Sequence, residues 1–157
     1  LLIPNAVVER LSAINKVGER ELIWQHSIER IFASPFFGYG AGTQPTYEFL
    51  HELNIKAAHA HNIILQLLLE GGIIALLLMG SIGAKVIKDG IVLLITKNHE
   101  AFWMGFGILG FAIMFLVHGM VDNPFSTPKL VVNFITLLGI VEQGYRLYIT
   151  ERHTNKK

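Results

Sequence analysis

The 157-residue chain contains no cysteine. This absence excludes a disulfide framework, a thiolate nucleophile and a cysteine-ligated metal, whichever side of a membrane the chain occupies. Charge is also scarce, because only 16% of the residues are Asp, Glu, Lys or Arg and the formal net charge is +1. Such a balance gives no global basic field, so we expect no nucleic-acid partner.

The first residues lack the features of a secretory signal. Leu1-Leu2-Ile3-Pro4 has no methionine and no basic residue, unlike the start of a signal peptide. We therefore expect the sequence to be the C-terminal part of a longer protein, with further membrane helices upstream.

Apolar residues are abundant. They make up 52% of the chain, and the mean hydropathy is +0.46, which is typical of a membrane protein. Three apolar stretches are long enough to cross a hydrocarbon core of about 30 Å. We predict an all-α, polytopic membrane bundle with transmembrane helices over residues 63–86, 101–121 and 130–149. Pro124 and Pro128 lie in the turn at residues 122–129, where they end one helix and start the next.

Basic residues gather at two of the predicted loops. Over residues 85–99, which contain most of the predicted loop at residues 87–100, the charge is +2, from Lys85, Lys88, Lys97 and Asp89. Around the tail at residues 150–157 it is +3, from Arg146, Arg152, Lys156, Lys157 and Glu151. The positive-inside rule makes both segments cytoplasmic. Residues 1–62 and 122–129 are then predicted to lie outside the cytoplasm.

The outer segment at residues 1–62 is predicted to contain two short helices. Residues 19–33 place five side chains along one helical face, which should lie on the membrane or on the bundle: Arg20, Trp24, Ser27, Ile28 and Ile31. A second helix is predicted to begin at Pro45 and to end at Asn54.

Three short motifs occur in order along the chain: Arg20-Glu21-Leu22-Ile23-Trp24, the glycine-rich residues 35–42, and His61-Asn62 at the start of the first span. In this order they resemble the O-antigen ligase and O-antigen polymerase family. That family has His followed by Asn, Ser or Gln, then nine residues, Gly, two residues and finally Gly, Thr or Tyr. Here Gly72 fits the pattern and Ala75 departs from it. The family also has Leu where this chain has Trp24.

The resemblance implies a C-type glycosyltransferase fold with an extracytoplasmic helical subdomain. It implies metal-independent transfer of a glycan from an undecaprenyl-pyrophosphate carrier, with no cofactor, at the periplasmic or extracellular face of a bacterial cytoplasmic membrane. The acceptor hydroxyl would belong to lipid A core, to a growing glycan or to a protein. Membrane lipids would surround the bundle.

His61 and Arg20 are the first candidates for this chemistry. A neutral imidazole has a pKa suited to taking the proton of the acceptor hydroxyl. A guanidinium holds a pyrophosphate at two points without losing its own proton, with Arg10 or Arg30 as second candidates. The competing interpretations are that His61 and Asn62 cap a helix, and that Arg20 is a solvated partner of Glu19 or Glu21.

Further polar residues could belong to the site. Asn62, Gln66 and Glu70 repeat every four residues and form a polar seam, which either lines the substrate or makes interhelical hydrogen bonds. His118 and Asp122 are also four apart, so the carboxylate could orient the imidazole for catalysis. Alternatively, both contact lipid headgroups.

Two patterns allow other chemistry. His59 and His61 could ligate a metal with Asp122 or Glu70 as a further ligand, although we predict no metal. Gly38, Gly40 and Gly42 could present backbone amides to phosphate, or could simply form a turn between two helices.

A different class of function fits the same residues. In a transporter or flippase subunit for lipid-linked glycans, the arginine and the polar seam would bind the substrate without reacting. Transfer alone requires a base, so His61 separates the two hypotheses.

Overall fold

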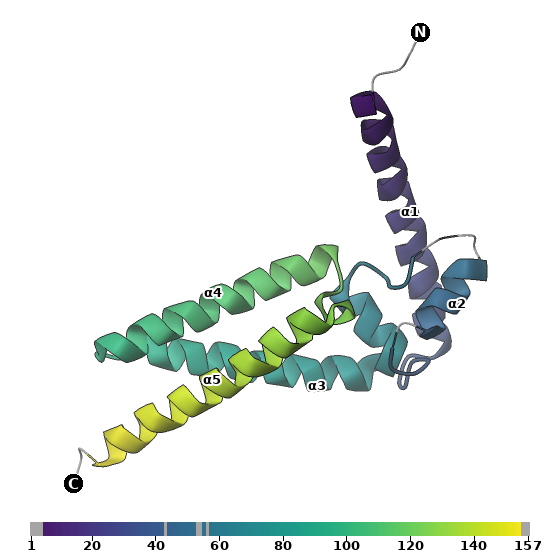
Figure 1. Ribbon diagram of the computed structural model, residues 1–157. Helices are drawn as coiled ribbons and strands as arrows, with labels where there is room; N and C mark the ends of the chain where they lie inside the picture. Colours follow the sequence, from purple (N-terminus) through teal and green to yellow (C-terminus); the bar gives the residue numbers. More distant parts are fainter. Residues whose placement is uncertain (1–4, 43, 53–54, 56, 155–157) are drawn as a thin grey trace. The chain divides into compact units, whose positions relative to one another are not determined.

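The computed structural model describes residues 5–42, 44–52, 55 and 57–154, with the side chains of residues 18–42, 46–52, 55 and 57–148. These residues form five α-helices and one 3₁₀-helix: α1 (Asn5–Ala33), α2 (Gln44–Glu52), α3 (Ile63–Leu94), α4 (His99–Val121), η1 (Pro124–Ser126) and α5 (Pro128–Thr154) (Figure 1). Helices α3, α4 and α5 are long and apolar enough to cross a membrane, which confirms the predicted all-α membrane fold class. The chain divides into two compact units, Leu1–Leu76 and Leu77–Lys157.

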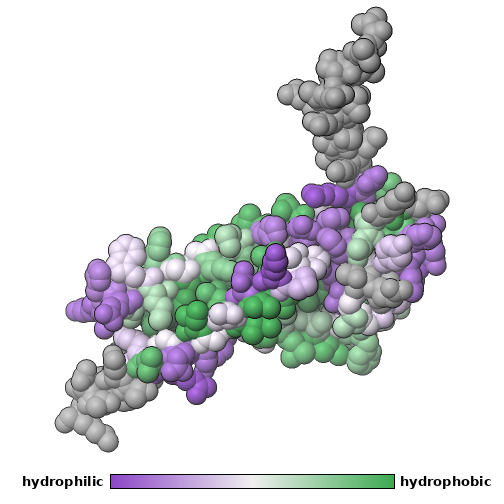
Figure 2. All heavy atoms as spheres, in the orientation of Figure 1, coloured by the Kyte–Doolittle hydropathy of each residue, from purple (hydrophilic) through white to green (hydrophobic). Residues whose placement is uncertain are grey.

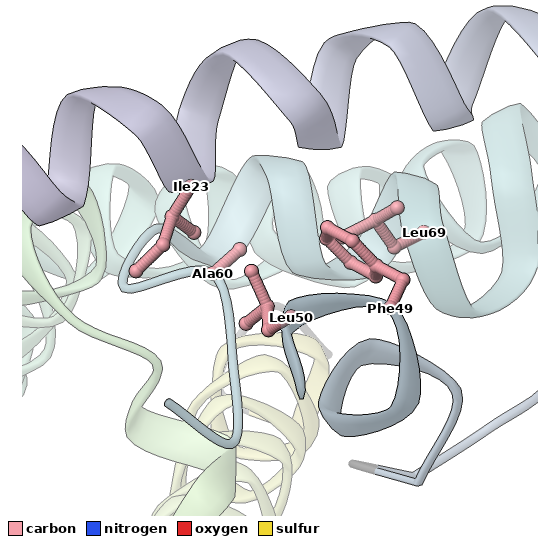
Figure 3. Close-up of a cluster of buried hydrophobic side chains, with 5 residues drawn as sticks. All are labelled: Ile23, Phe49, Leu50, Ala60 and Leu69. Carbon is pink, nitrogen blue, oxygen red and sulfur yellow. The ribbon is translucent and has the colours of Figure 1, made fainter. Parts of the chain in front are cut away.

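The first unit is built on a small apolar core. Figure 3 shows this core, which joins side chains of α1, α2, the following loop and the start of α3: Ile23, Phe49, Leu50, Ala60 and Leu69. Among the side chains of α1 that the structure describes, those of residues 18–33, Ile23 and Ser27 are buried, whereas Trp24 and Ile28 of the predicted face are more than a third exposed. The Ser27 hydroxyl donates to the Ile23 carbonyl at 2.6 Å, which satisfies its buried oxygen.

Helix α3 is broken at Gly71 and Gly72, where the backbone leaves helical values. Gly72 has a φ of 62°, a conformation that side chains with a Cβ rarely adopt. The segment Pro35–Gly40 fills the break. Tyr39 and Gly40 donate their N–H groups to the carbonyls of Leu69 and Glu70 at 2.7 and 2.9 Å, and Ile73 donates to Pro35 at 2.8 Å. Hydrogen bonds to the segment therefore satisfy these backbone groups of α3, although its helix is broken there.

The second unit contains the later part of α3 together with α4 and α5. Helices α3 and α4 approach closely at Gly90 and Gly105, because a Cβ on Gly105 would lie 2.6 Å from the Gly90 carbonyl oxygen. A core of four buried side chains joins the three helices: Leu93, Ala101, Ile108 and Val141. Figure 2 shows hydrophobic side chains along the middle of these helices, with hydrophilic ones at the α3–α4 turn.

Helix α3 continues to Leu94, beyond the predicted end of the first span at Val86. Asp89 of this extension belongs to a network of ion pairs. Lys85 Nζ lies 2.6 Å from Asp89 Oδ2 and 2.5 Å from Glu142 Oε2 of α5, and Glu142 Oε1 accepts from Arg146 Nε at 2.6 Å. The network holds two cations and two anions, so it is electrically neutral. Each charge of the network therefore has a partner of opposite sign.

Candidate active site around His61

His61 follows a loop segment that is held on two sides. The Trp24 indole N–H of α1 donates to the Ala60 carbonyl at 2.9 Å, and the Ala60 N–H donates to the Gln66 side-chain oxygen of α3 at 2.9 Å. Ala60 itself is fully buried. The residue before the candidate base is thus fixed between α1 and α3, which limits the positions that His61 can take.

The backbone of His61 is left-handed, with a φ of 49°, the only such non-glycine residue in the described chain. Histidine enters this region more readily than most residues, but the conformation still costs free energy. The His61 side chain is half-buried, and its ring centroid lies 4.3 Å from that of His59. Strained backbone at a titratable residue is frequent at functional sites.

Asn62 caps the first turn of α3. Its side-chain oxygen accepts from the N–H groups of Ile64 and Leu65 at 2.9 and 3.1 Å, and the residue is 7% exposed. These bonds satisfy helix donors that would otherwise have no partner. The capping interpretation therefore applies to Asn62.

Arg20 lies on α1, one helical turn before Trp24, and its side chain is exposed. Four residues correspond to about 6 Å along a helix, and side chains four apart share a face. Arg20 therefore lies on the side of α1 from which Trp24 contacts Ala60, in the loop at residues 57–61 (the His61 loop). Arg10 is farther along the same helix, and its side chain lies outside the described residues.

The predicted polar seam is a hydrogen-bonded network. The Gln66 amide donates to Glu70 Oε1 at 2.7 Å and to the Thr46 hydroxyl of α2 at 3.2 Å. Gln66 is 2% exposed and Thr46 is equally buried. Both groups of the Gln66 amide are thus used within the protein, whereas Glu70 keeps a half-buried carboxylate with capacity for further bonds.

The glycine-rich segment does not offer its amides to a ligand at residues 38–40. Gly38 N donates to the Ser34 carbonyl at 3.2 Å, and the next two N–H groups bind α3 as described above. A Cβ on Gly38 would lie 2.5 Å from the Leu69 carbonyl oxygen. Close approach to α3 explains this glycine, and the segment acts as a turn between α1 and α2.

His118 and Asp122 belong to the second unit, at the end of α4. The Asp122 N–H donates to the His118 carbonyl at 2.9 Å, and the Asp122 carboxylate accepts from the Asn123 N–H at 2.8 Å. A hydrogen bond between backbone groups therefore joins Asp122 to His118. The contact of the Asp122 carboxylate with the His118 imidazole stays a prediction.

Sequence reasoning missed the part that Trp24 takes in holding the His61 loop. An indole N–H needs a partner when it is partly buried, and this was the available signal. Sequence reasoning also missed the surroundings of Arg30, whose guanidinium lies 5.5 Å from the ring centroids of both Tyr39 and Phe49. Those contacts join residues that are 9 and 19 positions from Arg30, so no local pattern reveals them.

Comparison with known proteins finds one family. A model of the O-antigen ligase family matches residues 12–80. The matched range includes Arg20, His61 and the polar seam, but excludes Arg10, His118 and Asp122. No curated protein and no solved structure matches the chain.

Proposed function

We propose that the protein transfers a glycan from undecaprenyl pyrophosphate to an acceptor hydroxyl. The chain belongs to the O-antigen ligase family through residues 12–80, and this family supports a ligase-type function in O-antigen biosynthesis. The acceptor is lipid A core, a growing glycan or a protein. The reaction is metal-independent and takes place at the outer face of the cytoplasmic membrane.

The hydrogen bond from Trp24 to Ala60 carries this proposal. It ties the segment before His61 to the helix that carries Arg20 one turn away. A base for the acceptor and a cation for the leaving group are thereby brought to one side of α1. Positioning of this kind supplies a large part of the rate of transfer reactions.

The proposed step moves one proton and exchanges one bond. The acceptor hydroxyl gives its proton to the His61 imidazole while its oxygen bonds to the anomeric carbon. The bond from that carbon to the pyrophosphate oxygen breaks, and undecaprenyl pyrophosphate leaves with the electron pair. Arg20 binds the developing negative charge with two parallel N–H groups. Glu70 and the other polar groups of the seam border the same loop.

The break at Gly72 supports a place for this site at the membrane surface. A continuous helix of 32 residues would be about 48 Å long, whereas the hydrocarbon core is about 30 Å thick. The part after Gly72 is about 33 Å long and suffices to cross it. The part before Gly72 places Ile63 and Leu69 in protein interior instead of lipid. His61 then lies outside the hydrocarbon, where an acceptor hydroxyl can reach it.

Substitution of His61 tests transfer against transport. In the full-length protein, His61→Gln should abolish product while binding of the lipid-linked donor persists, because the base is lost and the arginine remains. His51→Gln replaces an exposed histidine of α2, so it is a matched control and should keep wild-type turnover. Full product from His61→Gln at matched membrane abundance would refute transfer chemistry at this residue and favour a transporter subunit.

A further inference from the structure

A cavity of about 210 Å³ lies between the second half of α1 and α2, apart from the His61 loop. Its lining combines two carboxylates, two basic side chains and two apolar ones: His26, Glu29, Arg30, Ala33, Phe49 and Glu52. All of these residues belong to the first unit.

The side chains of the cavity are held in place by mutual contacts. His26 Nδ1 lies 3.1 Å from Glu29 Oε2, and Arg30 Nη2 lies 3.4 Å from Glu52 Oε2. The Arg30 guanidinium also lies against the Phe49 ring. Both glutamates remain more than 70% exposed, so they keep acceptor capacity for a ligand. The arginine is pre-organised, which lowers the entropy lost on binding.

The composition of the cavity selects an uncharged, hydroxyl-rich ligand. The one arginine and two glutamates of the cavity, Arg30, Glu29 and Glu52, sum to a charge of −1, which disfavours phosphate or another anion. Carboxylates accept hydrogen bonds from hydroxyl groups, the guanidinium donates to their oxygens, and Ala33 with Phe49 offers an apolar wall. A sugar ring presents hydroxyls at its edge and C–H groups on its face.

We infer that this cavity binds an uncharged sugar unit of the glycan that the protein transfers. The inference rests on the proposed function, since it gives the glycan a second point of attachment. Trp24, which holds the His61 loop, precedes Arg30 by about 9 Å along α1. A sugar in the cavity would therefore belong to a different unit of the chain than the one that reacts.

The direct test is saturation-transfer NMR on the full-length protein in detergent, with the source cells' lipid-linked glycan, freed of lipid by mild acid, as probe. Wild-type protein should give signals at the ring protons. In the double variant Glu29→Gln/Glu52→Gln affinity should fall about tenfold, because hydrogen bonds to charged groups contribute most of the attachment. Glu21→Gln, an exposed neighbour on α1 outside the cavity, should bind as wild type.

Two outcomes would overturn the inference: no signal with wild-type protein, or equal affinity in the double variant. Inorganic phosphate that competes with the glycan for the cavity would also count against a sugar. His61→Gln should keep the NMR signals while it makes no product. If that variant makes full product, the proposed function fails independently of the cavity.

Discussion

At the scale of single residues, Trp24 has the most specific part in the account, because its indole N–H fixes Ala60 beside His61. Trp24→Phe keeps the ring and removes the donor. A buried carbonyl without a partner costs about 1–3 kcal/mol, and the loop that carries the base loosens. We expect turnover to fall about tenfold at unchanged membrane abundance, measured as product per molecule of protein.

Trp103→Phe is the matched control for this substitution. Its indole N–H also makes a side-chain hydrogen bond, to His99 at 3.1 Å, but on the exposed surface of α4. That variant should keep wild-type turnover. Equal turnover in both variants would show that the Trp24 hydrogen bond does not position the base.

Arg20 separates two-point binding from simple charge. If its guanidinium grips the pyrophosphate, Arg20→Lys keeps the charge but loses the fork geometry, so turnover should fall about tenfold. The turnover of Arg20→Ala should fall further than that of Arg20→Lys. A solvated ion pair contributes only about 0–1 kcal/mol, so under that interpretation both variants and Glu21→Gln would behave as wild type. Turnover with lipid-linked donor at matched abundance decides between the two.

At the scale of elements, the broken helix α3 determines how the first unit is put together. A Cβ on Gly72 would overlap the Phe36 backbone, and the left-handed φ adds about 1–2 kcal/mol for a residue other than glycine. Gly72→Ala should therefore lower the midpoint of thermal unfolding in detergent and displace the Pro35–Gly40 segment.

Gly80→Ala on the same helix is the control. A Cβ there meets open space in a helical backbone, so the change should be neutral or stabilising by up to about 1 kcal/mol. Similar unfolding midpoints for the two alanine variants would mean that the break at Gly72 is not required for packing.

At the scale of the whole molecule, hydropathy alone predicts the three apolar helices. Their runs of Leu, Ile, Phe and Val are long enough to cross a membrane and contain few charged residues. It does not predict that α3 reaches Leu94, since the Lys85–Asp89 and Lys85–Glu142 pairs compensate charges that hydropathy counts as unfavourable. The first turns of α1 were also missed, because the helix begins at Asn5 and the predicted one began at residue 19.

The candidate site was predictable only in part. His61 and Asn62 stand next to each other in a recognisable motif, and the cap made by Asn62 is local. The contact of Trp24 with Ala60 joins positions 36 apart, so it depends on how α1 packs on the following loop. The filling of the α3 break by the glycine-rich segment is equally non-local. Patterns within one helix cannot report such contacts.

Sidedness of the membrane tests the central claim most directly, because transfer from an undecaprenyl carrier at the outer face requires the His61 unit outside. The 157-residue chain has no cysteine, so single cysteines can be introduced without background. In intact spheroplasts, an impermeant maleimide should label a cysteine at exposed Glu21, and should label one at Lys97 in the α3–α4 turn only after lysis. Labelling of Lys97→Cys in intact spheroplasts, with Glu21→Cys protected, would reverse the topology and contradict the mechanism.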